Sequence, residues 1–294
     1  MWELLLWLAG LLLLGTGLQT FAFYAIWFYE QRVSPELAEV PGGSPVRWWP
    51  GLLGALREWL SITMLVVSYP LRLLHDASPV KNRRPGQEPI ILVHGYGGDS
   101  ANFLLMQWRL KRRGWRNVYA VSYTPPIIDA RKLAQQVADH VQDVLRVTQA
   151  EKAHLICHSM GGPLTRYAMH HLGLAGRVGK VITLGSPHSG SRIANLFPAI
   201  GAAFQMRYQS AFIHELNKLG EPPGGSHFYS IYSNFDNFIL PASSAVLANA
   251  GNIHVPLHGH CALLYSTRVL DEVEACLRGT SEQSEPAEEA AQDR

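Results

Sequence analysis

A serine in this sequence stands where it could act as a nucleophile. Ser159 lies in "HLICHSMGG", between an apolar run typical of a buried strand and a pair of glycines. In a nucleophile elbow the chain turns sharply from a strand into a helix, so the serine hydroxyl projects at the carboxyl edge of a sheet. The tight turn requires small residues two positions before and two positions after the serine. Gly161 meets this requirement, and Cys157 is small enough to meet it.

Two other readings of this segment exist. A serine before two glycines is also an ordinary helix N-cap. Cys157 is a poor candidate nucleophile, because a turn centred on it would need a small residue at position 155, which is Leu155. The interpretation of Ser159 as a nucleophile therefore depends on its companions elsewhere in the chain.

The first companion is "IILVHGYGG" at residues 90–98, a buried-type strand that ends in a His-Gly turn. Hydrolases with a nucleophile elbow place one oxyanion-hole donor in such a turn and the other directly after the serine. The backbone N–H groups of Tyr96 and Met160 are thus expected to bind the oxygen that becomes negative during the reaction. For the ring of His94 we expect a structural role in the turn.

The acid and the base follow by elimination, because a chain of this type carries its triad in the order serine, acid, histidine. Between Ser159 and the last histidine the acidic residues are Glu215, Glu221 and Asp236. Glu215 lies in a helical pattern and Glu221 lies in the loop "GEPPGG". Asp236 follows the strand-like run "FYSIYS" by a few residues, which is the position expected of the acid.

Three histidines remain for the base. His254 lies inside the last expected strand, and His260 directly precedes the helical run "CALLYSTRVLDEVEACL". A junction between a loop and a helix would hold the ring of His260 at the strand ends, so we assign His260 as the base and keep His258 in reserve.

The four segments "ILVHGYGG", "HSMGG", "SIYSNFD" and "GHCALLYS" together resemble the small bacterial triacylglycerol lipases, minimal members of the α/β-hydrolase family. The likeness runs in order through roughly residues 89–277. It implies Ser159 as nucleophile, Asp236 as acid and His260 as base, with backbone donors at Tyr96 and Met160. Those lipases tolerate alanine at the position of Cys157, so the departure there is mild.

The pattern of apolar and polar residues in 89–278 independently predicts an α/β fold. Short strand-like runs alternate with helical patterns such as 130–148, whose apolar residues fall on one face. This alternation indicates a mostly parallel sheet of about six strands with helices on both faces, the minimal α/β-hydrolase fold. The strands are expected within 89–95, 117–123, 153–159, 180–186, 227–233 and 252–259.

Residues 186–225 are longer than the corresponding part of a minimal lipase. They begin "SPHSGSRIANLFPAIGAAF", which resembles a phrase in larger lipases. Four apolar side chains there could form a lid or an acyl-binding wall, or could equally be core residues of two extra helices: Leu196, Phe197, Ile200 and Phe204. We treat the segment as a candidate lid insertion and these four residues as candidate substrate-binding residues.

The first thirty residues predict a membrane anchor. Residues 4–29 carry no charge, and about 20 apolar residues suffice to cross a bilayer. A cleaved signal peptide would need a basic start and a shorter apolar stretch, whereas this chain has Glu3 and a long one. We therefore expect a single-pass anchor at residues 1–30, in a bacterial inner membrane.

Residues 31–88 are expected to contain a linker and a second apolar helix. Residues 51–74 contain an uncharged core at 59–71, preceded by Arg57 and Glu58, that is too short for a comfortable crossing, which favours an interfacial or re-entrant helix. A tilted crossing and a helix packed against the catalytic domain are the alternatives. The basic residues Arg72, Lys81, Arg83 and Arg84 weakly favour a cytoplasmic location for everything downstream.

Composition narrows the remaining possibilities. The net charge of +2 without a long basic run argues against nucleic acid as a partner. Three widely spaced cysteines argue against a disulfide-stapled fold and against a CxxC metal or redox site. The tail at residues 279–294 is acidic, nearly free of large apolar residues, and expected to be disordered.

The sequence thus predicts a membrane-anchored serine esterase or lipase that hydrolyses fatty acyl esters without a metal or organic cofactor. Its expected partners are a lipid or acyl ester substrate and the membrane. The same triad could instead serve an acyltransferase or a thioesterase. A membrane-tethered interaction module that retained the hydrolase shell is the non-catalytic alternative.

Overall fold

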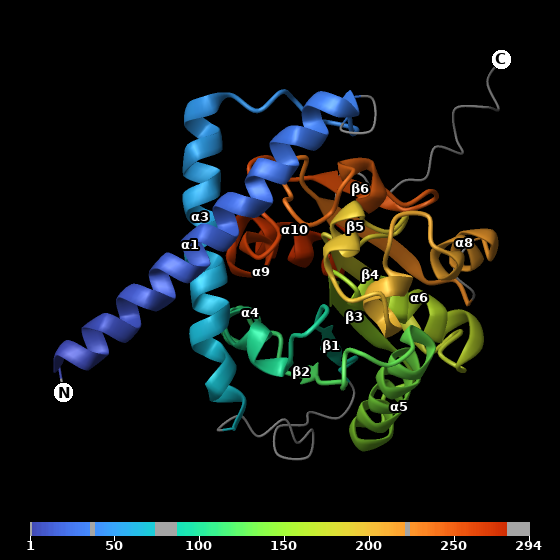
Figure 1. The fold of residues 1–294 in the computed structure, drawn as a ribbon. Coiled ribbons are helices and arrows are strands. Elements are labelled where there is room, and N and C mark those ends of the chain that lie inside the picture. The colour runs from blue at the N-terminus through green and yellow to red at the C-terminus, as the bar shows by residue number, and fades with distance from the viewer. Residues whose placement is uncertain (1, 36–38, 74–86, 221–223, 281–294) are drawn as a thin grey trace.

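Six parallel strands form one sheet in the order β2-β1-β3-β4-β5-β6 (Figure 1). The computed structural model describes residues 2–35, 39–73, 87–220 and 224–280. The strands are β1 (Ile90–Val93), β2 (Val118–Val121), β3 (Ala153–His158), β4 (Val178–Leu184), β5 (His227–Tyr232) and β6 (Gly251–His254). Each overlaps an expected strand, and the predicted α/β architecture is confirmed.

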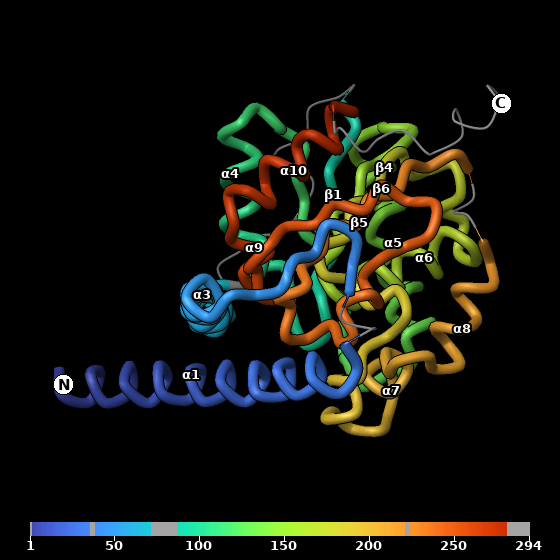
Figure 2. The backbone as a smooth tube through the Cα atoms, turned by 90° about the horizontal axis from the view of Figure 1, so that it is seen from above, coloured from blue at the N-terminus to red at the C-terminus, as the bar shows by residue number. Residues whose placement is uncertain are grey.

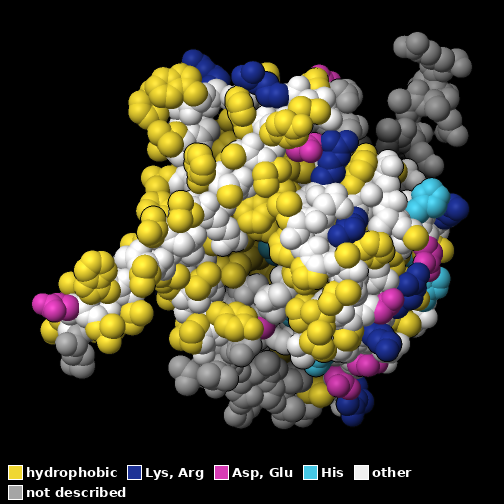
Figure 3. Space-filling model, viewed as in Figure 1, with side chains coloured by type: hydrophobic (Ala, Val, Ile, Leu, Met, Phe, Trp, Pro, Cys, Tyr) yellow, Lys and Arg dark blue, Asp and Glu magenta, His cyan; other side chains and the backbone are white. Residues whose placement is uncertain are grey.

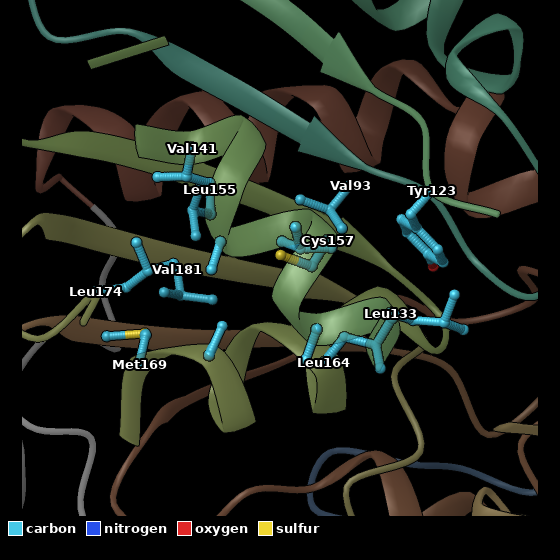
Figure 4. Close-up of a cluster of buried hydrophobic side chains, with 14 of the residues drawn as sticks. Val93, Tyr123, Leu133, Val141, Leu155, Cys157, Leu164, Met169, Leu174 and Val181 are labelled. Atoms are coloured by element: carbon cyan, nitrogen blue, oxygen red, sulfur yellow. The ribbon is translucent and has the colours of Figure 1, made fainter. Parts of the chain in front are cut away.

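The sheet is buried on both faces, which explains why its strands are nearly continuous apolar runs. Along β1, Ile91 and Val93 belong to one buried cluster, whereas Ile90 and Leu92 belong to the other. This alternation follows from the two-residue period of a strand. Figure 4 shows part of the first cluster, with the sulfur of Cys157 among its aliphatic side chains.

Helices cover each face of the sheet and complete these two clusters. One face is covered by α5 (Ala130–Thr148), α6 (Gly161–His171), α7 (Gly201–Gln205) and α8 (Ala211–Lys218). The other is covered by α4 (Leu104–Arg112), α9 (Ala262–Tyr265) and α10 (Thr267–Arg278). Short 3₁₀ turns also occur: η1 (Tyr69–Leu73), η2 (Ser100–Phe103), η3 (Arg192–Leu196) and η4 (Ala242–Ala245).

The helical run expected after His260 is divided into two helices. Ser266 adopts an extended conformation (φ −74°, ψ 133°) between α9 and α10, and its hydroxyl accepts a hydrogen bond from the Val269 N–H. This is the geometry of a serine N-cap. The preference of Ser266 for the N-cap position therefore ends α9 and starts α10 within the run that the sequence predicted as one helix.

Two long apolar helices precede the sheet: α1 (Trp2–Val33) and α3 (Trp48–Ser68). Within the described residues both are long and apolar enough to cross a membrane, a test that signal sequences and buried core helices also pass. The amino-terminal part of α1 projects away from the rest of the molecule, and α3 lies beside the domain (Figures 1 and 2). The structure thus begins the second helix at Trp48 rather than at residue 51.

One side of α3 faces the domain. Its buried residues include Gly54, Glu58, Ile62 and Ser68, at helical spacing, while Leu52, Leu56 and Leu60 are exposed. The arrangement matches the alternative in which this helix packs on the catalytic domain. Figure 3 shows hydrophobic side chains gathered over α1, α3 and the adjoining face, with charged side chains concentrated on the opposite side of the same view.

Several sequence expectations lie outside the described residues. These are the acidic tail beyond residue 280, the basic residues Lys81, Arg83 and Arg84, and the rejected acid Glu221.

Candidate active site

Ser159 lies at a sharp turn between β3 and α6 and has a φ of +54°. This left-handed conformation is costly for a residue with a side chain, and it is held here by close packing. A Cβ at Gly161 would lie 2.7 Å from the Val93 carbonyl oxygen and 2.8 Å from that of His94. The glycine two positions after the serine is therefore required by the turn, as the sequence predicts.

Cys157 satisfies the other small-residue position and points away from the site. Its Sγ lies 3.2 Å from Thr165 Oγ1 in the core, and burial raises the pKa of the thiol to about 12. A thiol with this pKa carries essentially no thiolate at neutral pH.

His260 and Asp236 form a buried hydrogen-bonded pair. His260 Nδ1 lies 2.9 Å from Asp236 Oδ2, and the two side chains are 6% and 2% exposed. The other oxygen, Oδ1, accepts hydrogen bonds from the N–H groups of Phe238 (2.8 Å) and Ile239 (2.9 Å). Burial lowers the pKa of His260, but the Asp236 carboxylate and, to a lesser extent, Glu58 oppose this, so the pKa lies above its usual value.

The pair is held by a glycine that the sequence analysis missed. Gly185, at the end of β4, has a φ of +52°, and a Cβ there would lie 2.7 Å from Asp236 Oδ2 and 3.2 Å from His260 Nδ1. Any larger residue would separate the carboxylate from the imidazole. The sequence feature that could have indicated this role is the position of Gly185 immediately after a strand, in "TLGS".

A second histidine lies against the first. The ring of His158 is 4.5 Å from that of His260, and its Nε2 lies 3.1 Å from the His260 carbonyl oxygen. Burial, followed by the proximity of His260, lowers the pKa of His158 well below its usual value. His158 is therefore neutral, and because a carbonyl can only accept, its Nε2 carries the proton.

Ser159 and His260 line the same cavity, which has a volume of about 290 Å³. Among the described residues, neither His260 nor any other group forms a hydrogen bond with the Ser159 hydroxyl. Catalytic hydrogen bonds are often long or poorly aligned until substrate binds. The structure thus places the serine beside the histidine–aspartate pair, in a state in which the two are not hydrogen-bonded.

Tyr96 and Met160 line this cavity as well. Within the described parts of the chain, neither of their backbone N–H groups has a hydrogen-bond acceptor. Two free donors next to Ser159 match the arrangement of an oxyanion hole.

The insertion contributes to the cavity differently from expectation. Phe197 lines it and packs edge-on against Tyr96, with ring centroids 5.5 Å apart. Leu196, Ile200 and Phe204 do not line it, and they are 61%, 55% and 47% exposed. The other residues of the insertion that line the cavity are Pro187, Ser191, Ile193, Ala194, Ala203 and Met206.

The remaining titratable candidates have structural contacts. The ring of His94 stacks on Tyr123 at 4.0 Å, and its Nε2 accepts a hydrogen bond from the Tyr123 N–H. Burial lowers the pKa of His94 to about 4. His258 is bonded to the Ser266 hydroxyl at 2.8 Å, and Glu215 pairs with Arg131.

The two apolar helices complete the cavity wall, which the sequence did not reveal. Ile62, Leu65 and Val66 of α3 and Gln19 of α1 line it opposite the sheet. The described residues contain no group of three or more His, Cys, Asp or Glu side chains that could hold a metal ion.

The chain is similar to known lipases in sequence and in fold. The family model "Lipase (class 2)" matches residues 87–274, which include Ser159, Asp236 and His260. A curated relative, a triacylglycerol lipase of Vibrio cholerae, is 34% identical over 113 residues, which cover 37% of this chain. The match spans 35% of that relative's length.

Solved structures share the fold. A lipase of Bacillus licheniformis in its mature form aligns with a TM-score of 0.57 at 17% identity, over 70% of this chain and 96% of that one. Lipase B of Aspergillus fumigatus aligns with a TM-score of 0.58 at 20% identity, over 71% of this chain and 57% of that one. At such identities the likeness establishes the α/β-hydrolase architecture of the sheet.

Proposed function

This chain belongs to the class 2 lipase family, and we propose that it is a membrane-anchored serine esterase that hydrolyses fatty acyl esters. Ser159 is the nucleophile, His260 the base and Asp236 the acid of its triad. Residues 1–30 form the anchor, 31–88 the linker and second helix, and 89–278 the catalytic domain, with residues 186–225 inserted in it.

The observation that carries this proposal is the buried hydrogen bond between His260 and Asp236 next to the strained Ser159. A carboxylate that accepts from Nδ1 fixes the imidazole tautomer, leaving Nε2 free to take a proton. The carboxylate is itself held by two backbone N–H groups, so it is pre-oriented before substrate arrives.

The reaction proceeds in two steps. Ser159 Oγ attacks the ester carbonyl carbon while His260 Nε2 takes the hydroxyl proton, and the N–H groups of Tyr96 and Met160 stabilise the tetrahedral oxyanion. Collapse of this intermediate breaks the ester bond, and the departing alcohol receives the proton from His260. Water, deprotonated by His260, then hydrolyses the acyl-serine and releases the fatty acid.

We further propose that the substrate reaches the site from the bilayer. The cavity wall is mainly apolar, and it includes Leu65 and Val66 of α3. The exposed side of the same helix is apolar as well, with Leu56 and Leu60 facing outward. An acyl chain can thus pass from lipid to the cavity along α3 with little exposure to water, which lowers the cost of leaving the membrane.

The anchor crosses a bacterial inner membrane once in this proposal, and the catalytic domain lies on the cytoplasmic side. This orientation is supported by Arg32, directly after the apolar part of α1, and by the basic residues from Arg72 to Arg84.

Replacement of Ser159 by alanine tests the proposed activity. The full chain in detergent micelles should hydrolyse p-nitrophenyl esters, and Ser159→Ala should abolish turnover while leaving thermal unfolding nearly unchanged. Wild-type activity in this variant would refute the assignment. Product analysis with water and with added alcohol separates hydrolysis from acyl transfer, and a folded wild-type protein without any turnover would favour the interaction module.

A further inference from the structure

Glu58 is a fully buried carboxylate at the centre of α3. Its Oε1 accepts a hydrogen bond from the Cys261 N–H at 2.9 Å, and its Oε2 accepts one from the Ala262 N–H at 2.8 Å. These two residues directly follow His260. One side chain of the second apolar helix therefore binds the backbone adjacent to the imidazole, across a sequence separation of more than 200 residues.

Glycines on both sides make this approach possible. A Cβ at Gly259 would lie 2.4 Å from Glu58 Oε2. A Cβ at Gly54, one turn earlier on α3, would lie 2.6 Å from the ring of Phe235 and 3.2 Å from the Leu257 carbonyl oxygen. The helix and the segment 257–262 are in contact at distances that only residues without a side chain permit.

A carboxylate is an expensive way to fill this position. Burial of a charge costs free energy that an apolar side chain of the same size would not cost. In the described parts of the chain, no Lys or Arg forms an ion pair with Glu58. Two hydrogen bonds from backbone N–H groups to a carboxylate are strong and fix its geometry. The contribution of Glu58 is therefore to fix the position of the backbone at residues 261 and 262.

We propose that Glu58 is a positioning residue, which holds the segment after His260 so that the imidazole stays in register with Asp236, and which makes this register depend on the seating of α3. The inference rests on the proposed function, because it gives Glu58 a role through the base of the triad. Under this proposal α3, the helix that we place next to the membrane, takes part in the geometry of the active site.

Several charged or titratable groups face His260. Each of them influences the pKa of His260 together with Glu58. Asp236 contacts the ring from the loop after β5, and His158 packs on it from β3. Cys261 is its chain neighbour, and Glu58 approaches from α3. Asp236 and the ionised form of Glu58 both favour the protonated imidazole, so removal of either charge should lower the pKa of His260. The shift from Glu58 is the smaller of the two, and it develops as Glu58 ionises, because burial raises the pKa of Glu58 to about 7.

The test compares Glu58→Gln with Glu151→Gln in the full chain. Glu151 is exposed and precedes β3, at the opposite end of the strand from His158, so its variant removes one negative charge far from the site. Glutamine keeps the shape of Glu58 but can accept at one atom only, so one hydrogen bond is lost. For Glu58→Gln we expect kcat for a soluble ester to fall on the order of tenfold to a hundredfold, because small misplacements of catalytic groups have such effects. KM should change little.

A second readout does not require activity. In protein labelled with ¹³C at histidine Cε1, with the His260 signal identified by its loss in His260→Ala, Glu58→Gln should lower the pH at which His260 titrates. Glu151→Gln should leave it unchanged. An unchanged titration together with unchanged kcat in folded Glu58→Gln would overturn the proposal.

Gly259→Ala provides an independent variant should Glu58→Gln fold poorly. The added methyl group would push the carboxylate away without removing its charge. We expect a reduced kcat with a smaller change in the His260 titration than in Glu58→Gln. Full activity in Gly259→Ala would also contradict the proposal. If the wild-type protein is inactive but Glu58→Gln still shifts the titration of His260, the proposed function is contradicted. The contact between Glu58 and the segment after His260 is then still supported.

Discussion

The Trp27 indole donates a hydrogen bond of 3.0 Å to the backbone carbonyl of Asn234, two residues before Asp236. Around this bond, Tyr24 packs on Phe235 with ring centroids 4.6 Å apart, and Phe23 stacks on Phe238 at 4.3 Å. The carboxyl-terminal part of α1 is therefore in direct contact with the loop that carries the acid. A helix expected only to anchor the chain also supports the active site.

Replacement of Trp27 by phenylalanine should weaken this support. An aromatic ring is kept, but it is smaller than the indole and has no N–H, so the loss of the hydrogen bond alone costs about 1 kcal/mol in unfolding free energy. We expect a lower midpoint of thermal unfolding and a several-fold lower kcat on a soluble ester. The matched control is Trp7→Phe, in the projecting part of α1, where the side chain is 74% exposed. Equal behaviour of the two variants would mean that the contact at Asn234 is incidental.

The two small residues of the elbow should respond differently to substitution. Gly161→Ala would place a methyl group 2.7 Å from the Val93 carbonyl oxygen, so the turn must open and Ser159 must move. We expect loss of most esterase activity and destabilisation by about 2 kcal/mol or more. Activity near that of the wild type in Gly161→Ala would show that the turn tolerates a side chain there.

Cys157→Gly serves as the contrasting variant. The thiol lies in the core and not in the cavity, so its removal should leave substantial activity and cost about 1 to 2 kcal/mol of stability through the space it vacates. Esterase assays and chemical denaturation measure both quantities. A folded but inactive Cys157→Gly protein would show that the thiol has a catalytic function.

These elbow residues were predictable because the turn imposes local steric rules that a sequence displays directly. The strands were predictable for a similar reason, since a sheet buried on both faces requires continuous apolar runs. Gly185 and Glu58 were not predictable, because each acts on partners far away in the chain. A glutamate in an apolar helix does not indicate that its acceptor atoms will meet the N–H groups of residues 261 and 262.

The wall residues of the insertion illustrate the same limit. Leu196, Phe197, Ile200 and Phe204 are all large and apolar, and sequence cannot decide which of them point inward. The structure turns Phe197 into the cavity and leaves the other three exposed. The contribution of α3 to the wall depends on tertiary packing as well.

Leu65 of α3 should influence acyl chain selection. Leu65→Trp would fill part of the cavity, so KM for long-chain p-nitrophenyl esters should rise while that for the acetate or butyrate ester changes little. Leu52→Trp is the matched control, because Leu52 lies near the start of the same helix, is exposed and does not line the cavity. The same chain-length profile in both variants would show that the acyl chain does not contact α3.

Stability should decrease as the solution is acidified. Burial lowers the pKa of His94 to about 4 and those of His158 and His188 well below their usual value. These rings stay neutral in the folded protein, whereas in the unfolded chain they bind protons near pH 6.5. The unfolded state thus gains protons as the pH falls from about 7 to 5, and the stability present above pH 6.5 is progressively lost.

His260 and Glu58 act in the opposite direction, because the pKa of His260 is raised and burial raises the pKa of Glu58 to about 7. Burial also lowers the pKa of four further histidines, His154, His170, His254 and His258, so the lowered groups outnumber the raised ones. The expected result is a lower midpoint of thermal unfolding at pH 5.5 than at pH 7.5 at constant ionic strength. A midpoint that stays constant or rises on acidification would contradict this expectation, because it would mean that the folded protein binds at least as many protons in this range as the unfolded chain does.

Labelling with a fluorophosphonate probe shows whether His260 activates Ser159, because the probe reacts with an activated serine hydroxyl. The full chain in detergent micelles is treated with the probe, digested and analysed by mass spectrometry. We expect a single phosphonylated serine at position 159, with labelling abolished in Ser159→Ala and strongly slowed in folded His260→Ala. Labelling at another serine, or undiminished labelling of Ser159 in His260→Ala, would contradict it.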